Sequence, residues 1–474
     1  MNKIILALIC VLLFAGLNTY PQNSINKEIA REAPDWISEG IMYQIWPRSF
    51  TIDGTLSAAT KKLPDIKELG ATIVYLCPVM LQDRDINKEF WSPRQQASPA
   101  NNPRNPYRIM DYTKVDPEYG TDEDLKEFIN TAHYLGLRVL MDLVYLHTGP
   151  SNTLIQNPEY YKRDENGNFI KNAYNFYDLN FENKELREFL LKNMEEWVIK
   201  YEFDGWRCDV SSGIPLDFWE EARKRMEKIK PDIGMLAESD NPKELVRAFD
   251  LSYGFTWFGA LKNVFANGES ATMLREKWES MNSKFPEGSR FIRWVDNHDQ
   301  HRPEIIFSSK GSKAANVINF MIDGVPFIYN GQEIGDGSPY GIEYYPEKSY
   351  NDNGAINWLA QTIPTKKELR NWYKELITLR KSETALQEGS TIWLNTDNPE
   401  SVVAFLRTKN NATILAIVNV SNRKLYVNVE SMQKDGKVYE ALFTDSDYKN
   451  VEVNNSKISF SLGSFGYFVG KLKE

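Results

Sequence analysis

Cysteine and histidine are both scarce in this sequence, with three cysteines and four histidines among 474 residues. Cys10 lies inside an apolar N-terminal run, so only Cys77 and Cys208 remain beyond that run. These two residues fall in separate predicted strands. We therefore expect two buried thiols, and the scarcity of cysteine excludes a fold held together by a disulfide framework.

The chain also lacks an excess of positive charge. Asp and Glu number 65 against 56 Lys and Arg, which gives a formal net charge of -9 at pH 7. Since no basic patch stands out, nucleic acid and anionic membranes are excluded as main partners. The sequence points to no protein partner and leaves the oligomeric state unknown.

No apolar run is long enough to cross a membrane. The longest, residues 4–17, follows Lys3 and has the length and flanks of a secretory signal. We expect residues 1–22 to be a signal peptide and the mature chain to have no membrane span. The expected location is the periplasm or the extracellular space, with a retained N-terminal anchor as the alternative.

What the sequence does contain is a repeated alternation of apolar strands and amphipathic helices. Nearly continuous apolar runs are typical of strands buried on both faces of a parallel sheet. Eight such strands alternating with helices predict an α/β fold, a (β/α)8 TIM barrel over residues 23–384. The predicted strands are 41–50, 72–79, 137–147, 203–210, 234–239, 251–257, 291–299 and 325–332, and the predicted helices are 56–69, 121–136, 185–201, 216–230, 313–322 and 366–381.

Two long βα-loop insertions, residues 80–118 and 148–181, interrupt this alternation. Loops of that length inside a compact domain are usually functional. From residue 385 to the end, short strands with turn signals between them predict an antiparallel β-sandwich as a second domain. Trp393 and Phe465 are candidate sugar-stacking residues there if exposed, and the alternative role of this domain is to cover the barrel.

Charged and histidine side chains gather at the predicted carboxyl ends of the barrel strands, where the active sites of such barrels lie. Taken alone, each of these residues has a structural explanation. An Arg-x-Asp pair on a strand, for example, is usually a buried ion pair. Their joint placement is what indicates a site. The residues are Asp142 and His147 on the third strand, Arg207 and Asp209 on the fourth, Glu238 on the fifth, and His298 and Asp299 on the seventh.

The residue types suggest roles for the carboxyl groups. Arg207 and Asp209 are two apart on a strand and point the same way, so we expect the guanidinium to lower the pKa of Asp209 and keep it ionised. Glu238 follows three apolar residues, which favours a raised pKa. An ionised and a protonated carboxyl are the pair that retaining glycoside hydrolysis needs, one as nucleophile and one as general acid and base.

The remaining groups fit the same chemistry. Asp299 is expected to bind sugar hydroxyls and to stabilise positive charge on the ring in the transition state. His147 and His298 are expected to donate hydrogen bonds to hydroxyls, although a lone histidine is more often structural.

These motifs resemble those of the α-amylase family of glycoside hydrolases, family 13, and the resemblance extends from about residue 41 to residue 474. It implies that Asp209 is the nucleophile, Glu238 the acid/base and Asp299 the transition-state stabiliser. It also implies that Arg207, His147 and His298 bind the sugar, and that Tyr107 stacks on its ring. The matching segments are 142–147, 205–209, 237–238 and 296–299, together with 177–180 and 324–333.

The chain departs from that family at several places, among them residues 51–55, which stand where some relatives have an acidic, Asn- and Gly-rich calcium loop. Leu146 stands where most members carry an Asn that ligates a structural calcium, and calcium prefers six to eight oxygen ligands. Although Asp178 remains, we expect no required metal or cofactor. Beyond Asp209 the chain lacks the Lys-His pair of many amylases. Arg108 follows Tyr107 where exo-acting α-glucosidases carry an Asp, which argues against a simple maltase or isomaltase.

The sequence therefore predicts a retaining glycoside hydrolase that cleaves α-glucosidic bonds in starch-like α-glucans or maltooligosaccharides through a covalent glycosyl-enzyme intermediate. Two alternatives stay open: an α-glucan transglycosylase or isomerase that uses the same site, and a catalytically silent sugar-binding protein on the same fold. Linkage preference, chain-length preference and endo or exo action are left open.

Overall fold

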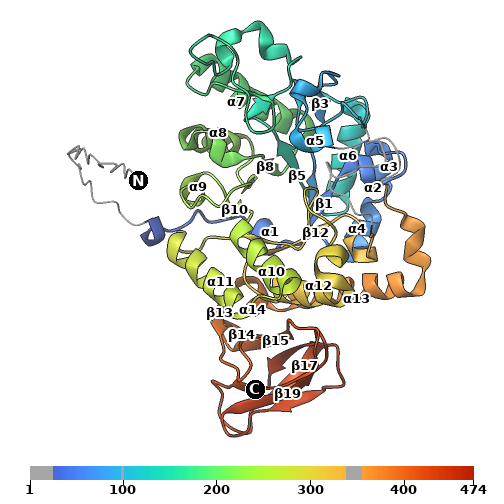
Figure 1. Ribbon diagram of the computed structural model, residues 1–474, viewed down its shortest axis with the longest axis vertical. Coiled ribbons are helices and arrows are strands. Elements are labelled where there is room, and N and C mark those ends of the chain that lie inside the picture. Colours follow the sequence, from blue (N-terminus) through green and yellow to red (C-terminus); the bar gives the residue numbers. More distant parts are fainter. Residues whose placement is uncertain (1–24, 98–100, 338–354, 474) are drawn as a thin grey trace, which may run out of the picture.

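Eight parallel strands form the centre of the larger domain. The computed structural model describes residues 25–97, 101–337 and 355–473, so the predicted signal peptide lies outside the described residues. Ser252 pairs with Phe291 in a parallel bridge, which closes the sheet into a barrel. The predicted TIM barrel is thus confirmed (Figure 1). Around the barrel the strands are β10 (Leu251–Ser252), β9 (Gly234–Ala237), β8 (Gly205–Cys208), β5 (Arg138–Leu143), β2 (Ile73–Leu76), β1 (Met42–Ile45), β12 (Val325–Tyr329) and β11 (Ile292–Arg293).

The strands are apolar because both of their faces are covered. Every residue of β1, β2, β8 and β9 is buried, as expected for a parallel sheet with side chains filling its interior and helices outside. Cys77 and Cys208 are buried free thiols, as predicted. The surrounding helices are α3 (Leu56–Thr60), α4 (Leu63–Leu69), α6 (Asp122–Tyr134), α7 (Lys184–Tyr201), α8 (Leu216–Ile229), α9 (Glu244–Arg247), α10 (Phe255–Asn267), α11 (Thr272–Lys284), α12 (Pro303–Met321) and α13 (Pro364–Ser382).

Several predicted elements differ in extent from the structure, and two of these differences have a clear physical reason. The helix predicted over 56–69 is two helices, α3 and α4, because Pro64 in the first turn of α4 has no backbone N–H to continue the hydrogen-bond ladder of α3. The strand predicted over 251–257 ends at Ser252. Gly254, at φ 65°, turns the chain directly into α10.

Each insertion has secondary structure of its own. In the first, β3 (Met80–Gln82) and β4 (Ile109–Val115) pair antiparallel and flank η2 (Lys88–Phe90) and α5 (Pro93–Ala97). In the second, β6 (His147–Thr148) pairs with β7 (Tyr177–Asp178). Both insertions leave the carboxyl ends of barrel strands, so they stand over the mouth where the predicted site residues converge.

The smaller domain consists of two antiparallel sheets packed face to face, and in Figure 1 it lies below α11, α12 and α14 (Thr384–Glu388). Trp393 contacts Trp278 and Phe465 stacks on Phe265, so both candidate stacking residues pack against the barrel. The strand predicted over 457–470 is two strands. The sheets are β13 (Ser390–Trp393), β14 (Val402–Lys409), β15 (Ala412–Asn419), β20 (Tyr467–Leu472), β17 (Val438–Thr444) and β18 (Asn450–Glu452), with β16 (Leu425–Glu430) and β19 (Lys457–Leu462) as the second sheet. Among the helices of the described ranges, none is both long and apolar enough to cross a membrane.

Gly205 offers a test of the barrel packing beneath the site. A Cβ at this position would lie 2.1 Å from the carbonyl oxygen of Gly234 and 2.6 Å from a methyl of Leu140. Gly205→Ala should therefore lower the free energy of unfolding by about 1–3 kcal/mol, the usual cost of overpacking, and lower the thermal midpoint. Gly259→Ala, in α10, is the matched control and should not destabilise the protein, because no atom outside the neighbouring helix backbone lies within 4 Å of the added Cβ. Equal midpoints for the two variants would contradict this packing.

Candidate active site

Arg207 is the centre of the site, and three carboxylates surround its guanidinium. Its Nη1 donates to Oδ1 of Asp142 at 2.7 Å and to Oδ1 of Asp209 at 2.8 Å. Its Nη2 lies 2.7 Å from Oε1 of Glu238, an ion contact without hydrogen-bond geometry. The barrel register produces this cluster, because β5 pairs Asp142 with Arg207 and β9 brings Glu238 beside the end of β8. Arg207 itself is fully buried.

The one guanidinium of this cluster cannot neutralise three carboxylates, and this changes the pKa expected for Asp209. Burial and the neighbouring charge of Glu238 raise the pKa of Asp209 well above its ordinary value, although Arg207 opposes them. Arg207 does act to lower this pKa, as predicted, but the expectation that the net pKa of Asp209 would lie below its ordinary value is wrong. The physical reason is that a single guanidinium, cut off from water, is shared by three carboxylates. Two acids that close cannot both ionise easily, so the arrangement favours one ionised and one protonated carboxyl.

Glu238 has the raised pKa that the sequence predicted. Burial is the main cause, and Arg207 opposes it. The backbone N–H of Val210 donates to Oε2 of Glu238 at 2.8 Å, which fixes the direction of the carboxyl group. Val210 makes this bond from a left-handed conformation, φ 40°, that a β-branched residue rarely adopts. Backbone strain is thus located directly after Asp209 and is used to hold Glu238.

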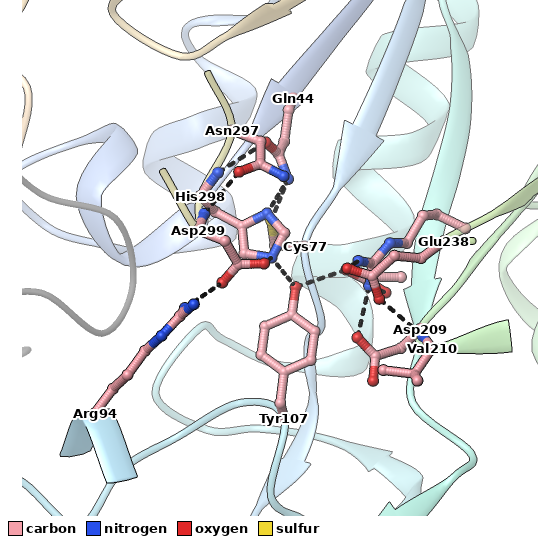
Figure 2. A network of polar contacts seen from close by, with 12 residues as sticks. Gln44, Cys77, Arg94, Tyr107, Asp209, Val210, Glu238, Asn297, His298 and Asp299 are labelled. Atoms are coloured by element: carbon pink, nitrogen blue, oxygen red, sulfur yellow. Dashed lines mark hydrogen bonds and ion pairs between the residues drawn. The ribbon is translucent and has the colours of Figure 1, made fainter. Parts of the chain in front are cut away.

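A hydrogen-bonded chain links His298 to the arginine cluster (Figure 2). Gln44 contacts Nδ1 of His298 with its amide nitrogen at 2.6 Å, so the ring proton sits on Nε2, which lies 2.8 Å from the hydroxyl of Tyr107. That hydroxyl in turn donates to Asp142 at 2.7 Å. Burial and the charge of Arg207 lower the pKa of His298 to about 3, so the ring is neutral. The chain fixes Tyr107 and His298 as parallel rings with centroids 5.4 Å apart.

His147 faces the pocket but already uses both ring nitrogens. Its Nε2 lies 3.0 Å from the carbonyl oxygen of Tyr107, and its Nδ1 lies 3.0 Å from the amide nitrogen of Asn172. Burial lowers its pKa to about 4, so this ring is neutral too. Donation from His147 to a sugar hydroxyl stays a prediction, because it requires one of these contacts to be exchanged.

A pocket of about 470 Å³, its open mouth included, lies above these groups. Asp209, Glu238 and Asp299 line it together with Tyr107 and His147, while Arg207 and His298 lie directly behind the pocket wall. The structure thus brings all seven predicted site residues together. Four further lining residues were not predicted from the sequence: Arg94, Tyr174, Phe176 and Val210.

Asp299 stands at the side of the pocket that the first insertion covers. Burial raises its pKa, and the charges of Arg94 and Arg207 oppose that rise. Nη1 of Arg94, on α5, lies 3.4 Å from Oδ1 of Asp299. The missed residues Arg94, Tyr174 and Phe176 lie in the two insertions, where no motif marks them. The only available signal was the length of these loops and their position after barrel strands.

The position where the resemblance implies a calcium ion does not suit one. Leu146 offers an apolar side chain that packs against Gly213, and Asp178 lies 3.5 Å from the ammonium of Lys162. One buried oxygen of Asp178, Oδ1, has no hydrogen-bond partner. A single such oxygen is far from the six to eight that calcium prefers. Within the described residues no group of three or more His, Cys, Asp or Glu side chains is placed to hold a metal ion.

Comparison with known families agrees with the fold. A family model described as the alpha amylase catalytic domain matches residues 44–173 and 160–353, which together make up more than half of the chain. A second model, described as the maltogenic amylase C-terminal domain, matches residues 392–469. The two matches fall on the barrel and on the smaller domain respectively.

Individual relatives are distant but align over most of their length. Alpha-amylase 2 of Dictyoglomus thermophilum is 25% identical over 456 residues, which cover 88% of this chain and 75% of the relative. A cyclomaltodextrinase of Geobacillus thermopakistaniensis is 25% identical over 448 residues, covering 82% and 70%. Among solved structures, the noncanonic maltogenic alpha-amylase AmyB of Thermotoga neapolitana has a TM-score of 0.79 at 26% identity and covers 92% of this chain and 98% of its own.

The shared guanidinium predicts a pH-dependent loss of stability when it is removed. An acid whose pKa is raised by folding binds more protons in the folded state than in the unfolded state. The stability of the folded protein therefore falls as pH rises through the folded-state pKa. Arg207→Met raises these pKa values further, so its destabilisation should be larger at pH 8 than at pH 5 and reach about 3–5 kcal/mol. Thermal midpoints at both pH values measure this.

Arg380→Met is the matched control, because Arg380 is equally buried but donates to the backbone carbonyls of Phe320, Ile322 and Gly324. Its destabilisation should differ little between pH 5 and pH 8. If both variants lost the same stability at both pH values, the three carboxylates would not depend on Arg207.

Proposed function

The chain belongs to the α-amylase family, glycoside hydrolase family 13, and from this premise we propose that it hydrolyses α-glucosidic bonds in starch-like α-glucans or maltooligosaccharides with retention of anomeric configuration. The observation that carries this proposal is the pair of carboxyl groups, Asp209 and Glu238, that share one buried guanidinium at the base of the pocket. Such a pair favours one ionised and one protonated member, which is the state that retaining hydrolysis requires.

We assign the ionised state to Asp209, because the family resemblance makes it the nucleophile, and in the proposed first step its carboxylate attacks the anomeric carbon of the sugar in the pocket. The bond from that carbon to the glycosidic oxygen breaks, and the protonated Glu238 gives its proton to the departing oxygen. The products of this step are a glycosyl ester of Asp209 and a released chain with a free hydroxyl. The N–H of Val210 supports the Glu238 carboxylate that is left behind.

In the second step, Glu238 takes a proton from a water molecule, and the water oxygen displaces Asp209 from the anomeric carbon. Two inversions at that carbon give net retention, and both carboxyl groups return to their starting states. Positive charge develops on the sugar ring in both transition states. Carboxyl groups outnumber the single guanidinium around Arg207, and Asp299 also lines the pocket. This excess of negative groups is suited to stabilise the positive charge on the sugar ring.

The neutral rings at the site have a binding role in this proposal. Tyr107 lines the pocket and is held in one orientation by Asp142 and by His298 behind it, which gives the sugar a rigid, preformed surface. The residues at the family's calcium position do not suit that ion, so we propose that hydrolysis needs no bound metal.

We also propose export to the periplasm or the extracellular space, on the basis of Lys3 and the apolar run 4–17.

The two alternative functions depend on the same side chains. A transglycosylase or isomerase would form the same ester of Asp209 and pass the sugar to another hydroxyl instead of to water. A silent sugar-binding protein is disfavoured, because Asp209, Glu238 and Asp299 all line one pocket.

Replacement of the nucleophile tests the proposal. With soluble starch and maltoheptaose, in the presence of a calcium chelator, the wild type should release products that are initially in the α configuration. Asp209→Asn removes the attacking oxygen and should lower the rate by at least about 10³-fold. Asp217→Asn, an exposed residue paired with Arg187, is the control and should keep wild-type activity. Products and anomers are followed by chromatography and NMR.

Each proposed feature has its own contrary result. Initial β-configured products would contradict retention, and loss of wild-type activity in chelator would contradict independence from metal. Longer oligosaccharides in place of hydrolysis products would favour the transglycosylase.

A further inference from the structure

The two insertions are tied to each other beside the pocket, although they leave different barrel strands. Lys171 forms an ion pair with Glu89 at 2.5 Å and lies 4.1 Å above the ring of Phe90. The amide of Asn175 donates to the carbonyl oxygen of Trp91 at 2.8 Å. The rings of Phe90 and Tyr177 meet edge to face at 5.3 Å. We call these contacts the clasp; its residues are Glu89, Phe90 and Trp91 of the first insertion and Lys171, Asn175 and Tyr177 of the second.

The clasp lies next to the pocket lining in both insertions. Trp91 is three residues before Arg94, and Asn175 stands between Tyr174 and Phe176. Arg94, Tyr174 and Phe176 all line the pocket. The rings of Tyr174 and Phe176 stack at 6.3 Å, and Phe176 lies 4.8 Å from His147. A wall formed by both insertions therefore bounds the pocket from Asp299 to His147.

The position of this wall determines which hydroxyl of the bound sugar lies beside it. The anomeric carbon must lie at Asp209 and Glu238, and C4 lies across the pyranose ring from C1. Figure 2 shows Arg94 reaching Asp299 from the side away from Asp209 and Glu238. The wall thus stands where the 4-hydroxyl of the bound sugar must lie. In an α-1,4-glucan that hydroxyl carries the next unit toward the non-reducing end.

Arg108 explains how the wall is held. It is fully buried and donates to the backbone carbonyls of Phe90, Asp83, Asp85 and Pro103, and it does not line the pocket. Arg108 stands where exo-acting α-glucosidases of the family carry an Asp, so a cap on the chain end has to come from another residue. Arg108 cannot bind that end itself, but it fixes the clasp segment that brings Arg94 to the pocket.

From this geometry we infer that the pocket admits one terminal glucosyl unit, and that the enzyme removes glucose from the non-reducing ends of maltooligosaccharides, with Arg94 donating to the terminal 4-hydroxyl. This inference rests on the proposed function and narrows it to exo action. The bond that breaks joins C1 of the terminal unit to the oxygen of the next. Water supplies the hydroxyl on the released glucose, and the proton from Glu238 restores the hydroxyl on the shortened chain.

A blocked substrate tests the inference directly. Two 4-nitrophenyl α-maltopentaosides are compared, one with a free non-reducing end and one with an ethylidene bridge across its terminal 4- and 6-hydroxyls, together with free maltopentaose. The wild type should act at least about tenfold faster on the free form, and the first products from maltopentaose should be glucose and maltotetraose.

Two variants locate the effect in the wall. Arg94→Ala combined with Lys171→Ala opens the clasp and should gain cleavage of the blocked substrate, with products of mixed length. Arg163→Ala is the matched control, because its cation lies 5.6 Å over Phe169 and its Nε donates to the carbonyl oxygen of Pro158, both within the second insertion. It should keep the wild-type preference. If the double variant failed to fold, the wild-type preference and first products would still decide the question.

The contrary outcomes separate this inference from the proposed function. Equal wild-type cleavage of the free and blocked forms, or mixed first products, would overturn exo action and leave the glycoside hydrolase in place. Wild-type protein that cleaved neither form nor maltopentaose would overturn both.

Discussion

The buried guanidinium of Arg207 is the interaction on which the site depends. Its three carboxylate neighbours come from three adjacent barrel strands or their ends, so the barrel has to be closed and in register before the cluster exists. With Arg207 cut off from water, every carboxyl around it has a raised pKa. The cluster therefore holds protons at pH values where exposed carboxyls would have lost them. That property allows one member to attack and another to donate.

The surroundings of the cluster maintain this state. The rings of Tyr75, Tyr107 and Tyr253 lie about the guanidinium at 5.9, 6.0 and 5.4 Å, and Gln44 fixes His298 as a neutral ring. The insertions add the outer part of the wall. Stability and chemistry are thus coupled, because the same burial that makes the carboxyl groups reactive makes Arg207 indispensable to them.

Much of this could be predicted from the sequence, because the relevant signals are local. Apolar runs followed by charged residues gave the eight strands and placed Asp209, Glu238 and Asp299 at their ends. The direction of the Asp209 pKa could not be predicted, since it depends on how many carboxylates share Arg207. Arg94 was missed because its contact with Asp299 spans 205 residues of sequence and comes from a loop without a motif. The contacts between the two insertions could not be predicted either, because they join segments that are far apart in the sequence and meet only in the folded protein.

The central claim is that Asp209 forms a covalent bond to the sugar, and trapping that bond tests it most directly. The protein is incubated with 5-fluoro-α-glucosyl fluoride, which forms the intermediate faster than water removes it, and is then digested and analysed by mass spectrometry. The account predicts one added fluoroglucosyl group, on the peptide that contains Asp209, and its disappearance when a maltooligosaccharide acceptor is added. A label on another residue, or hydrolysis of the fluoride without any labelled peptide, would contradict it.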